Sequence, residues 1–312
     1  MKVYKSIEEI DRTEPCSIAL GTFDGVHPGH RLVIGHAVES AKERGIKSAV
    51  FTFSTESRLQ KKKNAEGKQA KGLISEDEKL RIFSELGVGY VFDLPFEESI
   101  SLLSPREFTE KLLIGKFNMR ECFCGFNYRF GFKAEGDVEM LSGLGRELGF
   151  DVNVLSELKI ENETVSSTLI RELITEGKLE EAAKFLGTPY SYSGIVVHGD
   201  GNGSSFGYAT CNLVPLEELC LPKEGVYAGE CRLPDGKKRA CMINLGSKPT
   251  LGKEERLIEV HILDYEGDLY GKTITVFFYK RLRDIVRFSN VGQLKERLIK
   301  DEAEVRSYFK GR

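Results

Sequence analysis

The sequence predicts an α/β fold in which a doubly wound parallel sheet is followed by a small antiparallel β-barrel domain with a C-terminal helix. The chain has 312 residues, more than one hydrophobic core usually organises, so we expect two domains. Its first half alternates short apolar runs with segments of helical periodicity, whereas its second half has short extended segments between turns. The pattern changes at Gly187, which places the domains at residues 1–187 and 188–312.

Short apolar runs in the first half are typical of buried strands. They cover residues 17–22, 48–53, 90–93, 121–125 and 152–155. Helices are predicted to begin near Arg31, Ser75, Ser104 and Asp137, and two shorter helices to cover residues 167–176 and 179–186. Strands and helices in alternation imply a parallel sheet covered on both faces, with ligands bound outside the carboxyl ends of the strands.

The second half carries alternating strand-like segments and a final helix. The predicted strands cover residues 191–197, 225–233, 238–244, 257–263 and 273–278. Because glycine and aspartate turns separate them, this pattern predicts a compact antiparallel barrel, with a sandwich as the alternative. The helix over residues 291–309 places Leu294, Leu298 and Val305 on one apolar face.

Composition limits the partners of the chain. The formal net charge of −3 gives no general attraction to nucleic acid or to an anionic membrane, so neither is expected as a partner. Seven cysteines without a C-x-x-C pair argue against a disulfide framework or a zinc ribbon and fit a reducing cytoplasm. No signal peptide or membrane-spanning apolar run is recognised. The lysine-rich residues 61–71 are predicted to form a solvated loop, with a lid as the alternative.

The residues after the first of these strands carry the strongest functional signal. Residues 21–30 read GTFDGVHPGH, and their three glycines allow the backbone to approach a ligand closely. The start of the following helix offers N–H groups and a positive dipole to an anion, and His27 and His30 face the same way. The turn is therefore predicted to hold phosphates during nucleotidyl transfer, with a pair of capping histidines as the alternative.

Hydroxyl side chains open the helix predicted at residues 167–176. Residues 165–171 read VSSTLIR, so these hydroxyls can cap backbone N–H groups or bind phosphate oxygens. Arg171 lies about one turn into the helix and points back at its start. Phosphate binding is the functional interpretation, and a simple helix cap is the alternative.

An aromatic loop follows the strand predicted at residues 121–125. Residues 125–131 read GFNYRFG, a composition suited to stacking on a planar ligand ring. A cluster of aromatic side chains in the core is the equal alternative.

These three motifs, in this order and spacing, resemble those of the bacterial bifunctional riboflavin kinase and FMN adenylyltransferase family, also called FAD synthetase. The resemblance extends from end to end and implies a nucleotidyltransferase-type sheet in the first half. It implies contacts with ATP or its phosphates from Gly21, Phe23, His27, Gly29, His30, Asn127, Ser167, Thr168 and Arg171, of which His27, His30 and Arg171 would be catalytic. Asp24 would fix the turn or lie near magnesium, and Phe130 would contact the flavin ring. One departure is the sequence TFSTES at residues 52–57, where the family has a turn rich in proline and histidine near its flavin pocket.

The second half resembles the riboflavin kinase module of the same family. The matching segments are residues 194–197, 209–212, 225–229, 244–250, 258–261, 268–271 and 283–288. The resemblance implies that Glu259 takes the proton of the riboflavin 5′-hydroxyl as it attacks the γ-phosphate. Thr210 and Asn212, two residues apart on an extended segment, would point the same way and hold Mg²⁺. Without the resemblance, a turn at an edge strand is the alternative for Thr210 and Asn212. A solvated strand carboxylate is the alternative for Glu259.

The resemblance also implies kinase contacts with phosphate and flavin, and the chain differs from the family at three positions near them. Gly199 and Gly203 would cradle a phosphate through their N–H groups, and Arg283 would contact the flavin. Asn202 and Ser204 stand where the family's glycine loop carries arginine, and Ala209 stands where it has proline. The missing guanidinium groups would weaken phosphate binding.

We therefore expect a bifunctional transferase. The C-terminal domain would phosphorylate riboflavin to FMN with ATP and Mg²⁺, and the N-terminal domain would adenylylate FMN to FAD with release of pyrophosphate. The FMN phosphate is itself the nucleophile and is already anionic, so that half needs no general base. The alternatives are an FMN adenylyltransferase whose kinase domain only binds flavin, and a non-catalytic flavin-binding regulator. The expected partners are riboflavin, FMN and ATP, and the expected state is a cytoplasmic monomer or weak homo-oligomer.

Overall fold

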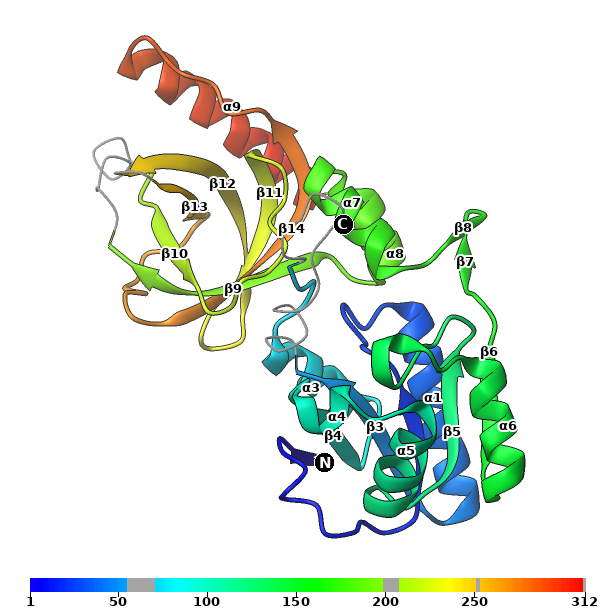
Figure 1. Ribbon diagram of the computed structural model, residues 1–312. Helices are drawn as coiled ribbons and strands as arrows, with labels where there is room; N and C mark the ends of the chain where they lie inside the picture. Colours follow the sequence, from blue (N-terminus) through cyan, green and yellow to red (C-terminus); the bar gives the residue numbers. More distant parts are fainter. Residues whose placement is uncertain (55–70, 199–207, 251–252, 311–312) are drawn as a thin grey trace. The chain divides into compact units, whose positions relative to one another are not determined.

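The computed structural model describes residues 1–54, 71–198, 208–250 and 253–310. The chain forms two compact units, a first unit of Met1–Ser167 and a second unit of Thr168–Arg312 (Figure 1). Residues 55–57, next to the predicted flavin pocket, and residues 61–70 of the lysine-rich loop lie outside the described residues.

The first unit is built on a parallel sheet of six strands. These are β1 Lys2–Tyr4, β2 Cys16–Leu20, β3 Lys47–Phe53, β4 Tyr90–Leu94, β5 Met119–Gly125 and β6 Asp151–Leu155, in the spatial order β1-β4-β3-β2-β5-β6. Every neighbouring pair is parallel. The predicted doubly wound sheet is confirmed, and only the three-residue edge strand β1 was not predicted.

Helices cover both faces of this sheet. They are α1 Pro28–Arg44, α3 Glu76–Glu85, α4 Glu98–Ser101, α5 Pro105–Glu107, the π-helix η1 Phe108–Lys116, the 3₁₀-helix η2 Phe132–Ala134 and α6 Val138–Leu148. The side chains of Ser75, Ser104 and Asp137 cap α3, α5 and α6, as their residue types predict. A two-stranded hairpin, β7 Lys159–Ile160 and β8 Glu163–Thr164, follows β6.

Alternate side chains of the central strands belong to two separate hydrophobic clusters. Ala19, Val50 and Val91 pack with buried residues of α1 and α3. Leu20, Phe51 and Phe92 pack with buried residues of η1 and α6. Because successive strand residues point to opposite faces, this division is the direct sign of a sheet buried on both sides.

The strand order places two of the predicted motifs beside each other. The chain proceeds from β2 through β3 to β4 on one side and then crosses to β5 on the other, so the order reverses between β2 and β5. Open α/β sheets bind their ligands outside the carboxyl ends of the strands at such a point. The turn at residues 21–27 leaves β2 there, and the aromatic loop leaves β5 at the adjacent position.

The second unit is a closed antiparallel barrel. Its strands are β9 Tyr190–Val197, β10 Cys211–Pro215, β11 Gly225–Arg232, β12 Lys238–Thr250, β13 Lys253–Ile262 and β14 Thr273–Arg283, in the order β10-β13-β12-β11-β14-β9. The barrel is therefore confirmed over the sandwich. Its helices are α7 Ser167–Glu176, α8 Leu179–Leu186 and α9 Val291–Lys310.

Helices α7 and α8 lie between the predicted domain boundary and the division of the chain into compact units. Helix α8 packs against β14 and β9, so the compact units group it with the barrel, whereas the predicted boundary at residues 187/188 leaves it with the sheet. The predicted boundary stays a prediction.

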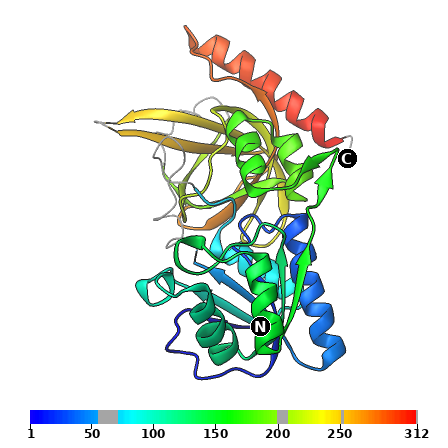
Figure 2. The ribbon, with the colours of Figure 1, turned by 45° about the vertical axis from the view of Figure 1, so that its right-hand side comes forward.

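Helix α9 packs on the outside of β11 and β12 (Figure 2). Its Val305 is fully buried in a cluster with Met242. A buried ion pair fixes the helix to β14, because Asp301, fully buried, accepts hydrogen bonds from Arg283 Nε and Nη2 at 2.9 and 2.7 Å. Arg297 Nε donates to the other carboxylate oxygen at 2.8 Å.

We expect Asp301→Asn to lower the free energy of unfolding of the barrel by about 3 kcal/mol, because the Arg283 guanidinium then loses its buried counter-charge. Urea unfolding measures this loss. Arg297→Ala is the control, since the Arg297 side chain is 31% exposed and its loss is expected to cost about 1 kcal/mol or less. Equal effects of the two substitutions would contradict the assignment of the Arg283 bond as the main attachment of α9.

Candidate active sites

The turn after β2 is held in an unusual backbone conformation. Phe23 and Val26 have φ of 47° and 39°, in the left-handed region that side chains other than glycine rarely adopt. Both side chains are buried, which anchors them in the core under α1. A Cβ on Gly21 would lie 3.0 Å from the Phe23 ring, so a larger residue there would crowd that ring. Strain of this kind persists where the surroundings fix it, and it concentrates at functional sites.

His27 is the N-cap of α1. Its Nδ1 accepts a hydrogen bond from the His30 backbone N–H at 3.3 Å, and Pro28 begins the helix. The two imidazole rings stack with centroids 3.6 Å apart, and a Cβ on Gly29 would lie 3.3 Å from the His27 ring. His27 therefore caps the helix, but this capping uses only Nδ1 and leaves Nε2 available for chemistry.

Burial sets the charge of His27. The side chain is buried, and this desolvation lowers its pKa to about 4, although Asp24 acts in the opposite direction. The ring is therefore neutral at pH 7. Because Nδ1 is a hydrogen-bond acceptor, the single ring proton belongs on Nε2, which makes His27 a neutral donor suited to a phosphate oxygen.

Asp24 holds the turn in place. It is 3% exposed, and its Oδ1 accepts a hydrogen bond from the Leu73 backbone N–H at 2.9 Å. Its backbone carbonyl accepts a bond from Ser167 Oγ, also at 2.9 Å. These contacts support the turn-fixing role among the two roles implied for Asp24, and they place Ser167 against the turn; its predicted contact with the triphosphate stays a prediction.

The aromatic loop after β5 divides into exposed and buried residues. Asn127 is exposed beside the carboxyl end of β5, and its predicted phosphate or ribose contact stays a prediction. Phe130 is only 5% exposed and packs near Phe108 in the core, with ring centroids 5.8 Å apart. The burial of Phe130 favours the core alternative, and its predicted flavin contact stays a prediction.

The remaining residues of the hydroxyl motif belong to the second unit. Thr168 is exposed and Arg171 is half-buried in the first turns of α7. Their predicted contacts with the triphosphate stay predictions.

Two predicted kinase residues lie opposite each other on neighbouring strands of the barrel. Asn212 on β10 pairs with Glu259 on β13, and Glu259 pairs with Asn244 on β12. The adjacent residues Val260 and Ile243 are buried, as interior positions of the barrel are, so Asn212, Glu259 and Asn244 form a row on its outer face. We call these three residues the polar row. Asn244 was not predicted as a site residue. The one signal for it in the sequence is that it begins residues 244–250, a segment that resembles the riboflavin kinase module.

Asn212 carries an unsatisfied oxygen. The residue is 4% exposed, and its Oδ1 has no hydrogen-bond partner among the residues that the structure describes. A buried amide oxygen without a partner is costly, and a hard cation would satisfy it. Thr210, its predicted partner in metal binding, is exposed two residues before it and follows Ala209, whose carbonyl accepts a bond from His261 Nδ1 at 2.8 Å.

The remaining predicted kinase residues are Arg283, Gly199 and Gly203. Arg283 pairs with Val226, the strand partner of Asn244, so it extends the line of the polar row. Its side chain binds Asp301, which gives it a structural role, and the predicted flavin contact stays a prediction. Gly199 and Gly203, with Asn202 and Ser204, lie outside the described residues.

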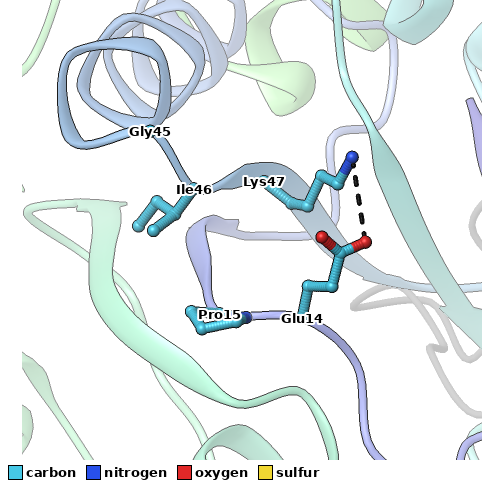
Figure 3. Close-up of a pocket in the computed structure, with 5 residues that line it drawn as sticks. All are labelled: Glu14, Pro15, Gly45, Ile46 and Lys47. Carbon is cyan, nitrogen blue, oxygen red and sulfur yellow. Dashed lines mark ion pairs between the residues drawn. The ribbon is translucent and has the colours of Figure 1, made fainter.

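A shallow hollow of about 220 Å³ lies at the opposite edge of the parallel sheet. It is lined by Glu14, Pro15, Gly45, Ile46 and Lys47, at the amino ends of β2 and β3. Lys47 and Glu14 form an ion pair at 3.8 Å there (Figure 3). Because ligands of such sheets bind at the carboxyl ends, this hollow is not a candidate active site.

Comparisons with known proteins agree with both halves. A family model described as FAD synthetase matches residues 9–169, and one described as riboflavin kinase matches residues 186–309. A bifunctional riboflavin kinase/FMN adenylyltransferase of Escherichia coli (strain K12) is 33% identical over 99% of this chain and 98% of its own length. Another from Listeria monocytogenes is 35% identical over 94% of this chain and 92% of its own length.

A solved structure has the same fold along nearly the whole chain. It is a protein from Streptococcus pneumoniae described as a macrolide-efflux protein, with a TM-score of 0.87 and 30% identity, covering 97% of this chain and 98% of that one. In the part of this chain that the structure describes, every helix is too short or too polar to cross a membrane.

The buried His27 predicts a pH dependence of stability. Its pKa is about 6.5 when unfolded and about 4 when folded, so between these values the unfolded state binds more protons and stability falls as the pH falls. We expect the first unit to lose roughly 3 kcal/mol on this account between pH 7 and pH 4. In His27→Asn, which keeps a capping oxygen, that part of the loss should disappear.

Urea unfolding of wild type and His27→Asn at pH 7, 6, 5 and 4 measures this dependence. His36→Asn is the matched control, because His36 lies on the same helix with its side chain 51% exposed. If the free energy of unfolding fell equally with pH in wild type and in His27→Asn, the claim that burial keeps the His27 imidazole neutral would be wrong.

Proposed function

The chain belongs to the family of bifunctional riboflavin kinase/FMN adenylyltransferases, and from this premise we propose which of its residues carry each reaction. The enzyme transfers the γ-phosphoryl group of ATP to riboflavin to give FMN, and the adenylyl group of ATP to FMN to give FAD. The riboflavin kinase module corresponds to residues 186–309 and the FAD synthetase module to residues 9–169.

The adenylylation site is the start of α1 with the turn before it. The observation that carries this assignment is the hydrogen bond by which His27 Nδ1 caps the helix, since it leaves Nε2 to donate to a phosphate oxygen. The helix N–H groups and His30 add donors at the same point, so negative charge on the α-phosphate and the departing pyrophosphate is stabilised as it develops. The FMN phosphate attacks without a general base.

Other groups complete this site in the proposal. Gly21, Phe23 and Gly29 shape the turn so that phosphates reach the helix start. Asn127 at the end of β5 contacts phosphate or ribose. We retain Ser167, Thr168 and Arg171 as triphosphate contacts because their motif resembles that of the family.

The FMN ring is proposed to bind at aromatic side chains near the carboxyl ends of β3 and β4. Phe53 and Phe96 are half-buried there, with ring centroids 4.8 Å apart in an edge-to-face arrangement. Exposed aromatic edges of this kind suit a planar ring. Phe130 supports the same aromatic cluster from within the core.

The kinase site is proposed to lie at the polar row. Glu259 takes the proton of the riboflavin 5′-hydroxyl, and Asn212 Oδ1 with Thr210 holds Mg²⁺. The fit is chemical, because Mg²⁺ prefers oxygen ligands and is commonly held by one or two protein groups together with substrate phosphates. When bound, the ion neutralises negative charge on those phosphates. Gly199 and Gly203 stay as phosphate contacts on the family resemblance.

We further propose that the enzyme works in the cytoplasm as a monomer or weak homo-oligomer on riboflavin, FMN and ATP. All seven cysteines are free thiols, which suits a reducing compartment.

His30→Ala is expected to lower FAD formation from FMN and ATP at least about 100-fold, because a donor at the developing phosphate charge is lost. Chromatography of the products measures it. Riboflavin phosphorylation by the same protein is the internal control and should be unchanged. FAD formation near the wild-type rate would contradict the proposed site.

Asn212→Leu is expected to raise the Mg²⁺ concentration for half-maximal FMN formation about tenfold or more, since a metal ligand is removed at nearly constant volume. A magnesium titration of kinase activity measures the shift. The magnesium dependence of FAD formation from FMN in the same variant serves as the control. An unshifted kinase titration would remove Asn212 from the metal site.

A further inference from the structure

Asn244 contacts the proposed kinase base directly. Its Nδ2 donates a hydrogen bond to Glu259 Oε2 at 2.9 Å, from the neighbouring strand of the barrel. Among the residues that the structure describes, no other hydrogen bond reaches the Glu259 carboxylate, so Oε1 keeps its lone pairs. An ionised carboxylate only accepts hydrogen bonds, so Asn244 presents its amide N–H groups to it.

The backbone of Asn244 is paired with a strand on each side. Its neighbours Ile243 and Leu245 are fully buried in the barrel. Strand β12 pairs with β11 on one side and β13 on the other at this point, with Val226 and Glu259 as the partners of Asn244. The amide donor is therefore placed by two ladders of backbone hydrogen bonds, and it can hold a carboxylate in one orientation.

The other side of Glu259 carries an acceptor. Asn212 lies opposite Glu259 on β10, and its buried Oδ1 has no partner in the described part of the chain. A carboxylate oxygen and an amide oxygen on the same side repel each other unless a donor or a cation comes between them. Glu259 thus has a protein donor on the β12 side and a place for a hydroxyl proton or a cation on the β10 side.

We propose that Asn244 is a positioning residue of the kinase reaction, which holds Oε2 of Glu259 so that Oε1 faces the substrate hydroxyl. This inference rests on the proposed role of Glu259 as the base. In the step, Oε1 takes the proton of the riboflavin 5′-hydroxyl while that oxygen bonds to the γ-phosphorus. The bond from the γ-phosphorus to the bridging oxygen breaks, its electrons remain with ADP, and Glu259 later releases its proton to water.

The test compares Asn244→Leu and the isosteric Asn244→Asp with wild type in steady-state FMN formation. Both variants should lower kcat about tenfold or more with KM for riboflavin and ATP changed about twofold or less, and the aspartate should be the worse because it places a second carboxylate against Glu259. Urea unfolding of the barrel reports on folding of each variant, and FAD formation from supplied FMN is the internal control for the first unit. Ser247→Ala, an exposed change on the same strand, is the matched control.

A double-mutant cycle separates positioning from a general structural role. In Glu259→Gln, FMN formation should be nearly lost, and adding Asn244→Leu should lower the residual rate about twofold or less. Full retention of kcat in Asn244→Leu, a change confined to KM, or an undiminished loss in the Glu259→Gln background would each overturn the inference. If Glu259→Gln alone retains kinase activity, the proposed base is wrong, and the inference falls with it.

Discussion

The hydrogen bond from the His30 backbone N–H to His27 Nδ1 is the constraint on which the first active site depends. This bond begins α1, and it also decides which ring nitrogen of His27 can donate to a ligand. Burial keeps the imidazole neutral, so the helix cap is not lost by protonation near neutral pH. The atom that starts the helix therefore prepares the chemistry at its N-terminus, and folding and phosphate binding share one residue.

Most of the fold could be predicted because its strands are buried. Strands β2 to β5 of the parallel sheet appear as largely apolar runs, since both of their faces are covered. Strand β10 was not predicted as a strand, although Asn212 was placed on an extended segment, because its outward side chains are Asn212 and the exposed, apolar Val214 and so give no regular polar alternation. The extension of β12 to Thr250 was also missed, since Gly246 and Pro249 argue against a strand and, among the described residues, β13 alone pairs with it there.

The candidate residues could be predicted better than their contacts. Asn212 and Glu259 are 47 positions apart in the sequence and meet only because β10 pairs with β13 in one register. Arg283 was predicted to contact flavin, but a carboxylate on α9 takes its charge. Phe130 shows the same difficulty, because an aromatic side chain in a loop has equal reasons to meet a ligand or the core. Which reason prevails depends on tertiary packing.

The polar row also has a consequence for how such a barrel can evolve. Side chains alternate between the interior and the outer face, so one inserted or deleted residue in β13 would turn Glu259 inward and place an isoleucine or valine on the outer face. Substitutions can change this site gradually, but length changes within these strands cannot. Sequence length should therefore vary in the loops that join the strands, while the spacing inside each strand is inherited unchanged.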